Sequence, residues 1–312
     1  MLILASGCGT SNSPRAKEPV SSTTLAITEG NVSTAAAEPE YLGSYTLMDE
    51  KFGTMVQVTV DGSIRTINSN ALPNHETGAF PTSGNPNTIS AQNTSYNYTT
   101  EPVYVGSASR VRTTGVAVNG VKFEPGTAEL VTCESGETFR IEGLQDIYDL
   151  GMDFNNAHVQ PTGEYHYHGV SHRLIDAYAS SSNLVHVGFA ADGFLMYYSK
   201  TGMYQSSYGL SKTPRVGNNC KARGPDGNTN VAIAETPPNG TYTSDWMYRE
   251  GSGHLDSCNG ITIDGKYMYL ITDSYPYVGR CLNGAVSSEA GMAPRNDPPP
   301  RRHGHPPPFR RP

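Results

Sequence analysis

Three of the nine histidines of this chain, His158, His166 and His168, lie within eleven residues of one another. The last two belong to the run 165–168, in which tyrosine and histidine alternate. Successive side chains of an extended strand point to opposite faces, so His166 and His168 should share one face and the tyrosines the other. Pro161-Thr162-Gly163 is a turn signal, and a hairpin there could bring His158 to the same face.

Three imidazoles on one face suggest a transition-metal site. Neutral imidazole binds copper, zinc, nickel or iron, and three histidines can leave one coordination position open. The alternative is an amphipathic strand with its tyrosines in the core and its histidines in solvent. Because a third histidine lies so near the pair, we favour a metal or catalytic site and predict His158, His166 and His168 as ligands. His75 would be a fourth ligand if the loop 68–80 folds over this hairpin.

Copper is favoured slightly over zinc, because a histidine-rich site without cysteine thiolates follows the Irving-Williams preference. Carboxylates near the histidines could complete the sphere, orient an imidazole or act as a general base. The candidates are Glu164, on the strand face of His166, and Asp192, although an Asp-Gly pair is more often a simple turn. His254 is a weaker candidate ligand.

The run Gly163-Glu164-Tyr165-His166-Tyr167-His168-Gly169, preceded by Asn155-Asn156-Ala157-His158, resembles the signature of the YHYH-domain proteins. This is a family of exported proteins from bacteria and some eukaryotes. Further blocks resemble the family in the same order: Leu72 to His75, Asn85 to Asn87, Val118 to Val121, Pro125 to Glu129, Ala190 to Phe194, Leu255 to Gly260 and Thr272 to Cys281.

The resemblance covers roughly residues 65 to 284 and implies a domain of this family. It implies no particular activity, because none is established for the family, so the chemistry must come from the residues. Two positions depart from the family pattern. Leu195 stands where the family usually has proline, and a tight Asp264-Gly265 turn replaces a longer loop. Neither departure involves the histidines, but any loop contacts to a substrate become doubtful.

The start of the chain indicates export. Ala5-Ser6-Gly7-Cys8 follows a short apolar run and resembles the lipobox of a bacterial lipoprotein, in which the cysteine is lipidated. We expect residues 1–8 to be the end of a signal peptide whose beginning is missing. Residues 9–40 are small and polar, as in a flexible tether. A lipid on Cys8 would hold the protein at a membrane of the bacterial cell envelope, periplasmic or at the cell surface, without spanning it. A cytosolic protein with an accidental Ala-Ser-Gly-Cys is the alternative.

Four cysteines remain if Cys8 is lipidated, and an even number in an exported chain favours two disulfides. Cys258 and Cys281 flank two runs that read as a hairpin, so their ends can meet. Cys133 and Cys220 are then paired by elimination. A zinc site made of all four cysteines is the alternative, although no Cys-x-x-Cys spacing occurs.

The composition is typical of an exported all-β domain. Charged residues make up 16% of the chain, against about 25% in an ordinary globular protein. Three alternating segments, 55–60, 115–118 and 261–263, each precede an Asp-Gly or Asn-Gly pair that favours a hairpin turn. We therefore predict one mainly β domain, sandwich- or barrel-like, over residues 41–290. One short helix is expected at Arg173 to Ser180.

Residues 291–312 are predicted to form a disordered, basic tail rich in proline and arginine. The tail is either simply solvated or in contact with an anionic surface. The chain as a whole has a net charge of −7, which argues against nucleic-acid binding. Gly-x-Ser-x-Gly and His-Glu-x-x-His motifs are absent. The sequence thus favours a metal-binding envelope lipoprotein. A metal-dependent envelope enzyme, hydrolytic or oxidative, and a metal-free module that recognises a glycan or a partner are the alternatives.

Overall fold

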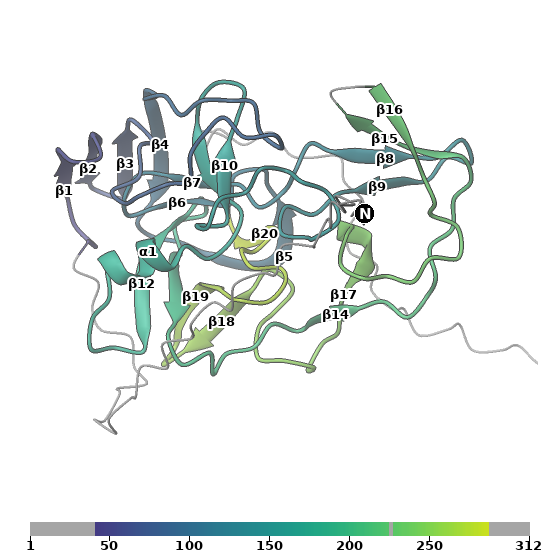
Figure 1. The fold of residues 1–312 in the computed structure, drawn as a ribbon. Coiled ribbons are helices and arrows are strands. Elements are labelled where there is room, and N and C mark those ends of the chain that lie inside the picture. Colours follow the sequence, from purple (N-terminus) through teal and green to yellow (C-terminus); the bar gives the residue numbers. More distant parts are fainter. Residues whose placement is uncertain (1–40, 225–226, 287–312) are drawn as a thin grey trace, which may run out of the picture. The chain divides into compact units, whose positions relative to one another are not determined.

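The computed structural model describes residues 41–224 and 227–286, which all belong to one compact unit of the chain. Strands dominate, so the prediction of a mainly β protein is confirmed (Figure 1). Within the described residues the strands form five separate sheets, and none of these closes into a barrel. The predicted lipobox with Cys8, the tether 9–40 and the tail 291–312 lie outside the described residues.

The largest sheet has eight strands and carries the histidine run at one end. Its order is β10 (Ala157–Val159), β11 (Tyr165–Tyr167), β7 (Lys122–Phe123), β6 (Gly115–Ala117), β12 (Leu184–Ala190), β13 (Leu195–Ser199), β19 (Lys266–Ile271) and β18 (Gly260–Ile263). Most neighbours are antiparallel, but β11 runs parallel to β7 and β13 runs parallel to β19. Strand β10 is therefore an edge strand of this sheet.

A four-stranded meander forms the second layer of the core. It consists of β1 (Tyr45–Asp49), β2 (Thr54–Asp61), β3 (Ile64–Ser69) and β4 (Thr94–Thr99), in that order. Its strands alternate buried and exposed residues, as in a sheet with one face toward the core. Val58 and Ile67 belong to the same apolar cluster as Val116 and Phe189 of the eight-stranded sheet. The two sheets thus bury their inner faces against each other, which is the sandwich-like packing that was predicted.

The remaining strands form smaller sheets. One has the order β16 (Gly227–Val231), β15 (Cys220–Gly224), β8 (Leu130–Thr132) and β9 (Thr138–Arg140). Two strand pairs complete the set, β14 (Tyr208–Leu210) with β17 (Trp246–Tyr248) and β20 (Cys281–Gly284) with β5 (Tyr104–Arg110). A 3-10 turn, Thr243–Asp245, precedes β17.

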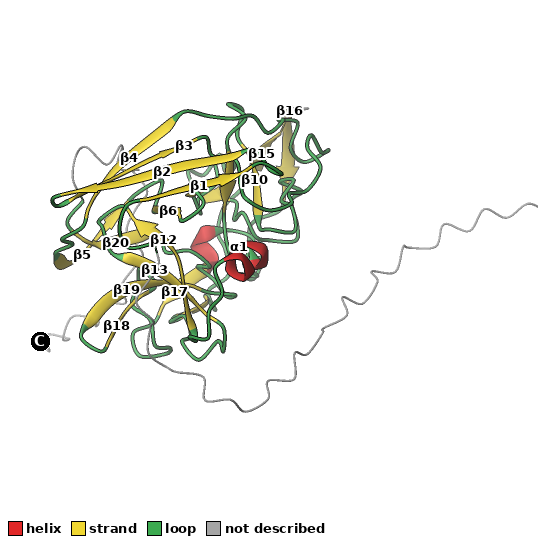
Figure 2. Cartoon of the chain, turned by 90° about the vertical axis from the view of Figure 1, so that its left-hand side faces the viewer, coloured by secondary structure: helices red, strands yellow, loops and turns green. Residues whose placement is uncertain are grey.

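All three predicted hairpins are present: β2 with β3, β6 with β7, and β18 with β19. At the third turn, Asp264 and Gly265 both have positive φ, 49° and 75°, as a type I′ turn requires. The α-helix of the described residues, α1 (His172–Ala177), is close to the predicted segment (Figure 2). It begins one residue earlier because the Ser171 side chain accepts a hydrogen bond from Leu174 N and caps it. No helix of the described part is long and apolar enough to cross a membrane.

Both predicted disulfides are confirmed. Cys133 is bonded to Cys220, and Cys258 is bonded to Cys281. The first joins the end of β8 to the start of its partner β15, and the second joins the residues before β18 to the start of β20. A zinc site made of the four thiolates is thereby excluded, because the sulfur atoms are bonded to one another.

Candidate metal centre

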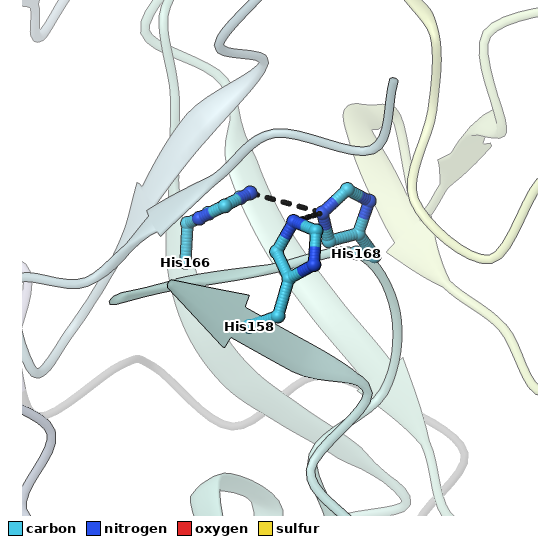
Figure 3. Close-up of side chains that lie close together, drawn as sticks. All are labelled: His158, His166 and His168. Atoms are coloured by element: carbon cyan, nitrogen blue, oxygen red, sulfur yellow. Dashed lines mark hydrogen bonds between the residues drawn. The ribbon is translucent and has the colours of Figure 1, made fainter. Parts of the chain in front are cut away.

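The register of the β10–β11 hairpin brings the first two histidines together. His158 lies directly opposite His166, with Ala157 opposite Tyr167 and Val159 opposite Tyr165. The predicted alternation also holds, because Tyr165 and Tyr167 are fully buried in the core while the imidazoles gather on the other face. His168 follows the end of β11 and joins them (Figure 3).

The three Nε2 atoms converge on one point. His168 Nε2 lies 2.9 Å from His166 Nε2 and 3.1 Å from His158 Nε2 (Figure 3). Two ligand nitrogens that hold one ion at about 2.05 Å with a tetrahedral angle are about 3.3 Å apart. The spacing in the protein is close to this value, so one ion can contact all three imidazoles.

The other nitrogen of each ring faces a backbone carbonyl. His158 Nδ1 lies 2.9 Å from Leu150 O, His168 Nδ1 lies 3.3 Å from Pro125 O, and His166 Nδ1 lies 3.4 Å from Glu164 O. A carbonyl oxygen can only accept a hydrogen bond, so this arrangement favours the tautomer with the proton on Nδ1. In that tautomer each Nε2 carries a lone pair, and no proton lies between the nitrogens joined by dashed lines in Figure 3, so the lone pairs face one another. A cation at their centre would remove this repulsion, and a carbonyl on the far nitrogen is the usual outer partner of a metal-ligating histidine.

Burial keeps the three imidazoles neutral. His166 and His168 are 2% and 1% exposed. Loss of solvation lowers the pKa of all three rings below the ordinary histidine value, and for His166 and His168 the neighbouring imidazoles lower it further. Since metal and proton compete for the same lone pair, a depressed pKa makes these nitrogens available as ligands at neutral pH.

A charged network lies beside the cluster on the neighbouring strand β7. Lys122 is opposite His166 in the parallel β11–β7 register. Its ammonium group donates to Glu164 (2.8 Å), Glu124 (2.9 Å) and Gln160 (3.0 Å). The sequence interpretation missed Lys122, Glu124 and Gln160, because the pairing of two strands more than forty residues apart leaves no local pattern in the chain.

The two candidate carboxylates have other partners. Glu164 is held by Lys122, as described above. Asp192 is fully buried and accepts hydrogen bonds from Tyr269 OH (2.6 Å) and Gly284 N (2.9 Å). Burial raises the pKa of Asp192 above its ordinary value. The structure therefore does not bring Asp192 to the histidine cluster.

His75, predicted as a fourth ligand, lies outside the cluster. Its Nδ1 lies 3.0 Å from Glu76 O, which leaves Nε2 to accept a hydrogen bond of 2.6 Å from Tyr167 OH. Asn119 Nδ2 donates to the same phenol oxygen at 3.0 Å. The loop does fold onto the hairpin, but it contacts the tyrosine face, so His75 anchors the strand that carries His166. The remaining candidate, His254, accepts a hydrogen bond from Gln205 N, away from the cluster.

The outer edge of the hairpin is capped by two asparagines. Asn85 Nδ2 and Asn87 Nδ2 each donate a 2.8 Å hydrogen bond to Val159 O on β10. These residues belong to the Asn-Pro-Asn block that the sequence already marked, and they cover a carbonyl that an edge strand would otherwise leave free.

Comparison with known proteins gives one match. Residues 89–284, more than half of the chain, match the family described as YHYH protein. The chain belongs to the YHYH family. The matched region contains the histidine run and all four disulfide-bonded cysteines, whereas His75 precedes it. No curated protein and no solved structure shows a significant match to the chain.

Proposed function

We propose that this YHYH protein binds one transition-metal ion, copper or zinc, through Nε2 of His158, His166 and His168. The observation that carries the proposal is the convergence of three Nε2 atoms whose rings all present Nδ1 to backbone carbonyls. A structural role for the histidines would give each Nε2 a partner outside the cluster. With the proton on Nδ1, the three Nε2 lone pairs instead face one another.

The donor set favours a borderline metal ion. Three neutral imidazoles without a thiolate suit copper(II) and zinc, and copper stands higher in the Irving-Williams order. The disulfides remove the only described cysteine sulfurs from competition. We therefore place copper ahead of zinc.

A metal-dependent enzyme is the second candidate, hydrolytic or oxidative. It is favoured by the number of protein ligands, because a closed structural site normally has four and a catalytic site keeps one position free. The cluster in the described residues has three. Metal loading without turnover would leave storage or transport as the role.

We further propose that the protein works in the bacterial cell envelope, with Cys8 carrying the lipid. Two disulfides support an exported protein, because such bonds persist in oxidising compartments. The sequence Ala5-Ser6-Gly7-Cys8, which resembles a lipobox, supports lipidation of Cys8.

The metal proposal is tested by titrating copper and zinc, each with a competing chelator, into metal-free protein. Wild type should bind one ion, and His166→Ala or His168→Ala should weaken binding by at least about 100-fold, since one of three ligands is lost. The matched control is His172→Ala, which removes an exposed histidine outside the cluster. Tyr165→Phe, on the opposite strand face, should also leave the affinity nearly unchanged. If His166→Ala binds either metal as tightly as wild type with the same stoichiometry, the histidines are not ligands.

A further inference from the structure

A cavity of about 680 Å³ lies beside the histidine cluster. One wall is the loop 143–152 and the other includes Thr272, Asp273 and Tyr277. Its volume falls within the range of about 300–1,000 Å³ that is usual for small-molecule sites. Neither the metal proposal nor the sequence motifs assign it a ligand.

The lining of this cavity selects the charge of its ligand. Asp146, Asp149 and Asp273 contribute three carboxylates, and no described lining residue is lysine, arginine or histidine. Arg280 follows the second wall in the chain, but its guanidinium is already paired with the buried Glu142 at 2.7 Å. Arg280 therefore does not neutralise the three carboxylates, which are all exposed. Asp273 accepts a hydrogen bond from Tyr198 OH (2.9 Å) and lies 4.0 Å from His172 Nε2, so Asp146 and Asp149 are the carboxylates furthest from a cationic partner. They disfavour phosphate, sulfate or carboxylate ligands and favour a cation.

Two tyrosines give the cavity aromatic surface as well. Tyr148 and Tyr277 line it from opposite walls, and both are half-buried. The face of an aromatic ring attracts a cation, and carboxylates beside such rings are suited to an ammonium group whose substituents are apolar. Cavity size, negative charge and aromatic walls thus agree on one class of ligand.

We propose that this cavity binds an organic cation of the quaternary ammonium type and that its occupancy opposes metal binding at the histidine cluster. The second half of this statement rests on the proposed function, whereas the first half does not.

The coupling follows from residues that belong to both sites. Leu150 lines the cavity, and its carbonyl accepts the hydrogen bond from His158 Nδ1 at 2.9 Å. Asn156 also lines it, and Asn156 O accepts from His168 N at 2.8 Å. Gly143 completes this shared wall, because a Cβ added there would lie 2.7 Å from His168 Nδ1. Two positive charges on the two sides of one wall repel, so each ligand should weaken the other by the same factor.

The first experiment uses metal-free full-length protein and isothermal titration with choline. Its nitrogen has no lone pair, so choline does not compete as a metal chelator through that atom. The uncharged isostere 3,3-dimethylbutan-1-ol has the same shape and should bind at least tenfold more weakly. The double variant Asp146→Asn/Asp273→Asn should also lose at least tenfold in choline affinity.

A charge-matched control separates the cavity from the general charge of the protein. Asp61→Asn/Asp264→Asn removes two exposed carboxylates from hairpin ends and should leave choline binding unchanged. Absence of choline binding would overturn the proposal. Equal binding of the isostere, or equal loss in the control variant, would overturn it too, since charge recognition in the cavity would then be absent.

The second experiment repeats the copper titration in saturating choline. We expect the metal affinity to fall by about fivefold, the lower end of ordinary coupling between sites, and the choline affinity of the metal-loaded protein to fall equally. If both ligands bind with unchanged affinities, the coupling is refuted. If choline binds to the cavity but no metal binds to the histidines, the proposed function fails while the cavity assignment stands.

Discussion

Gly143→Ala offers a test of the histidine site that replaces none of the proposed ligands. The φ angle of Gly143 is not in the positive range that favours glycine, so alanine can adopt the same backbone conformation. The added Cβ, however, would lie 2.7 Å from Nδ1 and 3.1 Å from Cγ of His168. Met152 Cε, at 3.2 Å, is the end of a flexible side chain and can move aside.

The required shift can be worked out from these distances. An ordinary van der Waals contact begins at 3.4 Å, so the gap between Cβ and Nδ1 must widen by 3.4 minus 2.7, or 0.7 Å. His168 is 1% exposed and packed on all sides, which leaves either a tilt of its ring or a displacement of the loop. Both movements disturb the hydrogen bond from Nδ1 to Pro125 O, and both change the direction of Nε2 relative to the other two imidazoles. Changes to such outer partners typically cost about 10- to 100-fold in metal affinity.

The assay is a competition titration of copper and zinc, with urea unfolding of the metal-free protein measured in parallel. Overpacking of this kind costs about 1–3 kcal/mol, so the variant should fold but be less stable. Gly43→Ala is the control, because a Cβ there meets nothing within 4 Å. Wild-type metal affinity in a folded Gly143→Ala protein would refute the assignment of His168 as a ligand fixed by this loop.

Three further outcomes are expected. Cys258→Ser should lower the free energy of unfolding by about 2–5 kcal/mol, measured by urea titration, and a shift below about 1 kcal/mol would contradict a stabilising role for the bond to Cys281. Burial lowers the pKa of His186 to about 3, below its unfolded value of about 6.5. The buried ring therefore does not reduce the free energy of unfolding above pH 6.5. Below pH 6.5 the unfolded state binds a proton that the folded state does not, so stability falls by about 1.4 kcal/mol per pH unit. Unfolding at pH 7.5, 6 and 5 should therefore show a shallower loss for His186→Gln than for wild type, and identical slopes would argue against a buried neutral imidazole. With an upstream signal sequence supplied, Cys8→Ala should move the protein from the membrane to the soluble fraction. Unchanged membrane partitioning would contradict lipidation of Cys8.

The histidine pair was predictable because its geometry is local. Strand alternation placed His166 and His168 on one face, and a turn signal a few residues upstream brought His158 opposite His166. The same holds for the hairpin at Asp264-Gly265, whose residues specify the turn type. Short-range rules of this kind require no knowledge of the tertiary fold.

The surroundings of the site were not predictable, because they come from distant segments. The carbonyls of Pro125 and Leu150 hold two of the imidazoles, yet any residue type supplies a carbonyl. His75 shows the opposite difficulty, since its loop does reach the hairpin. A sequence pattern cannot tell which face of a strand such a loop will contact, and here it is the face of Tyr167.

The two asparagines that cap β10 limit how far the eight-stranded sheet can extend. Strand β10, of three residues, is the edge strand of an eight-stranded sheet, and unpaired backbone groups on an edge strand can pair with another chain. Asn85 and Asn87 occupy the carbonyl through which a newcomer would pair. The cap therefore disfavours extension of the sheet beyond β10 by a second molecule. If the histidines bind a metal as proposed, a metal bridge shared between two paired hairpins is disfavoured, and we expect one ion per polypeptide.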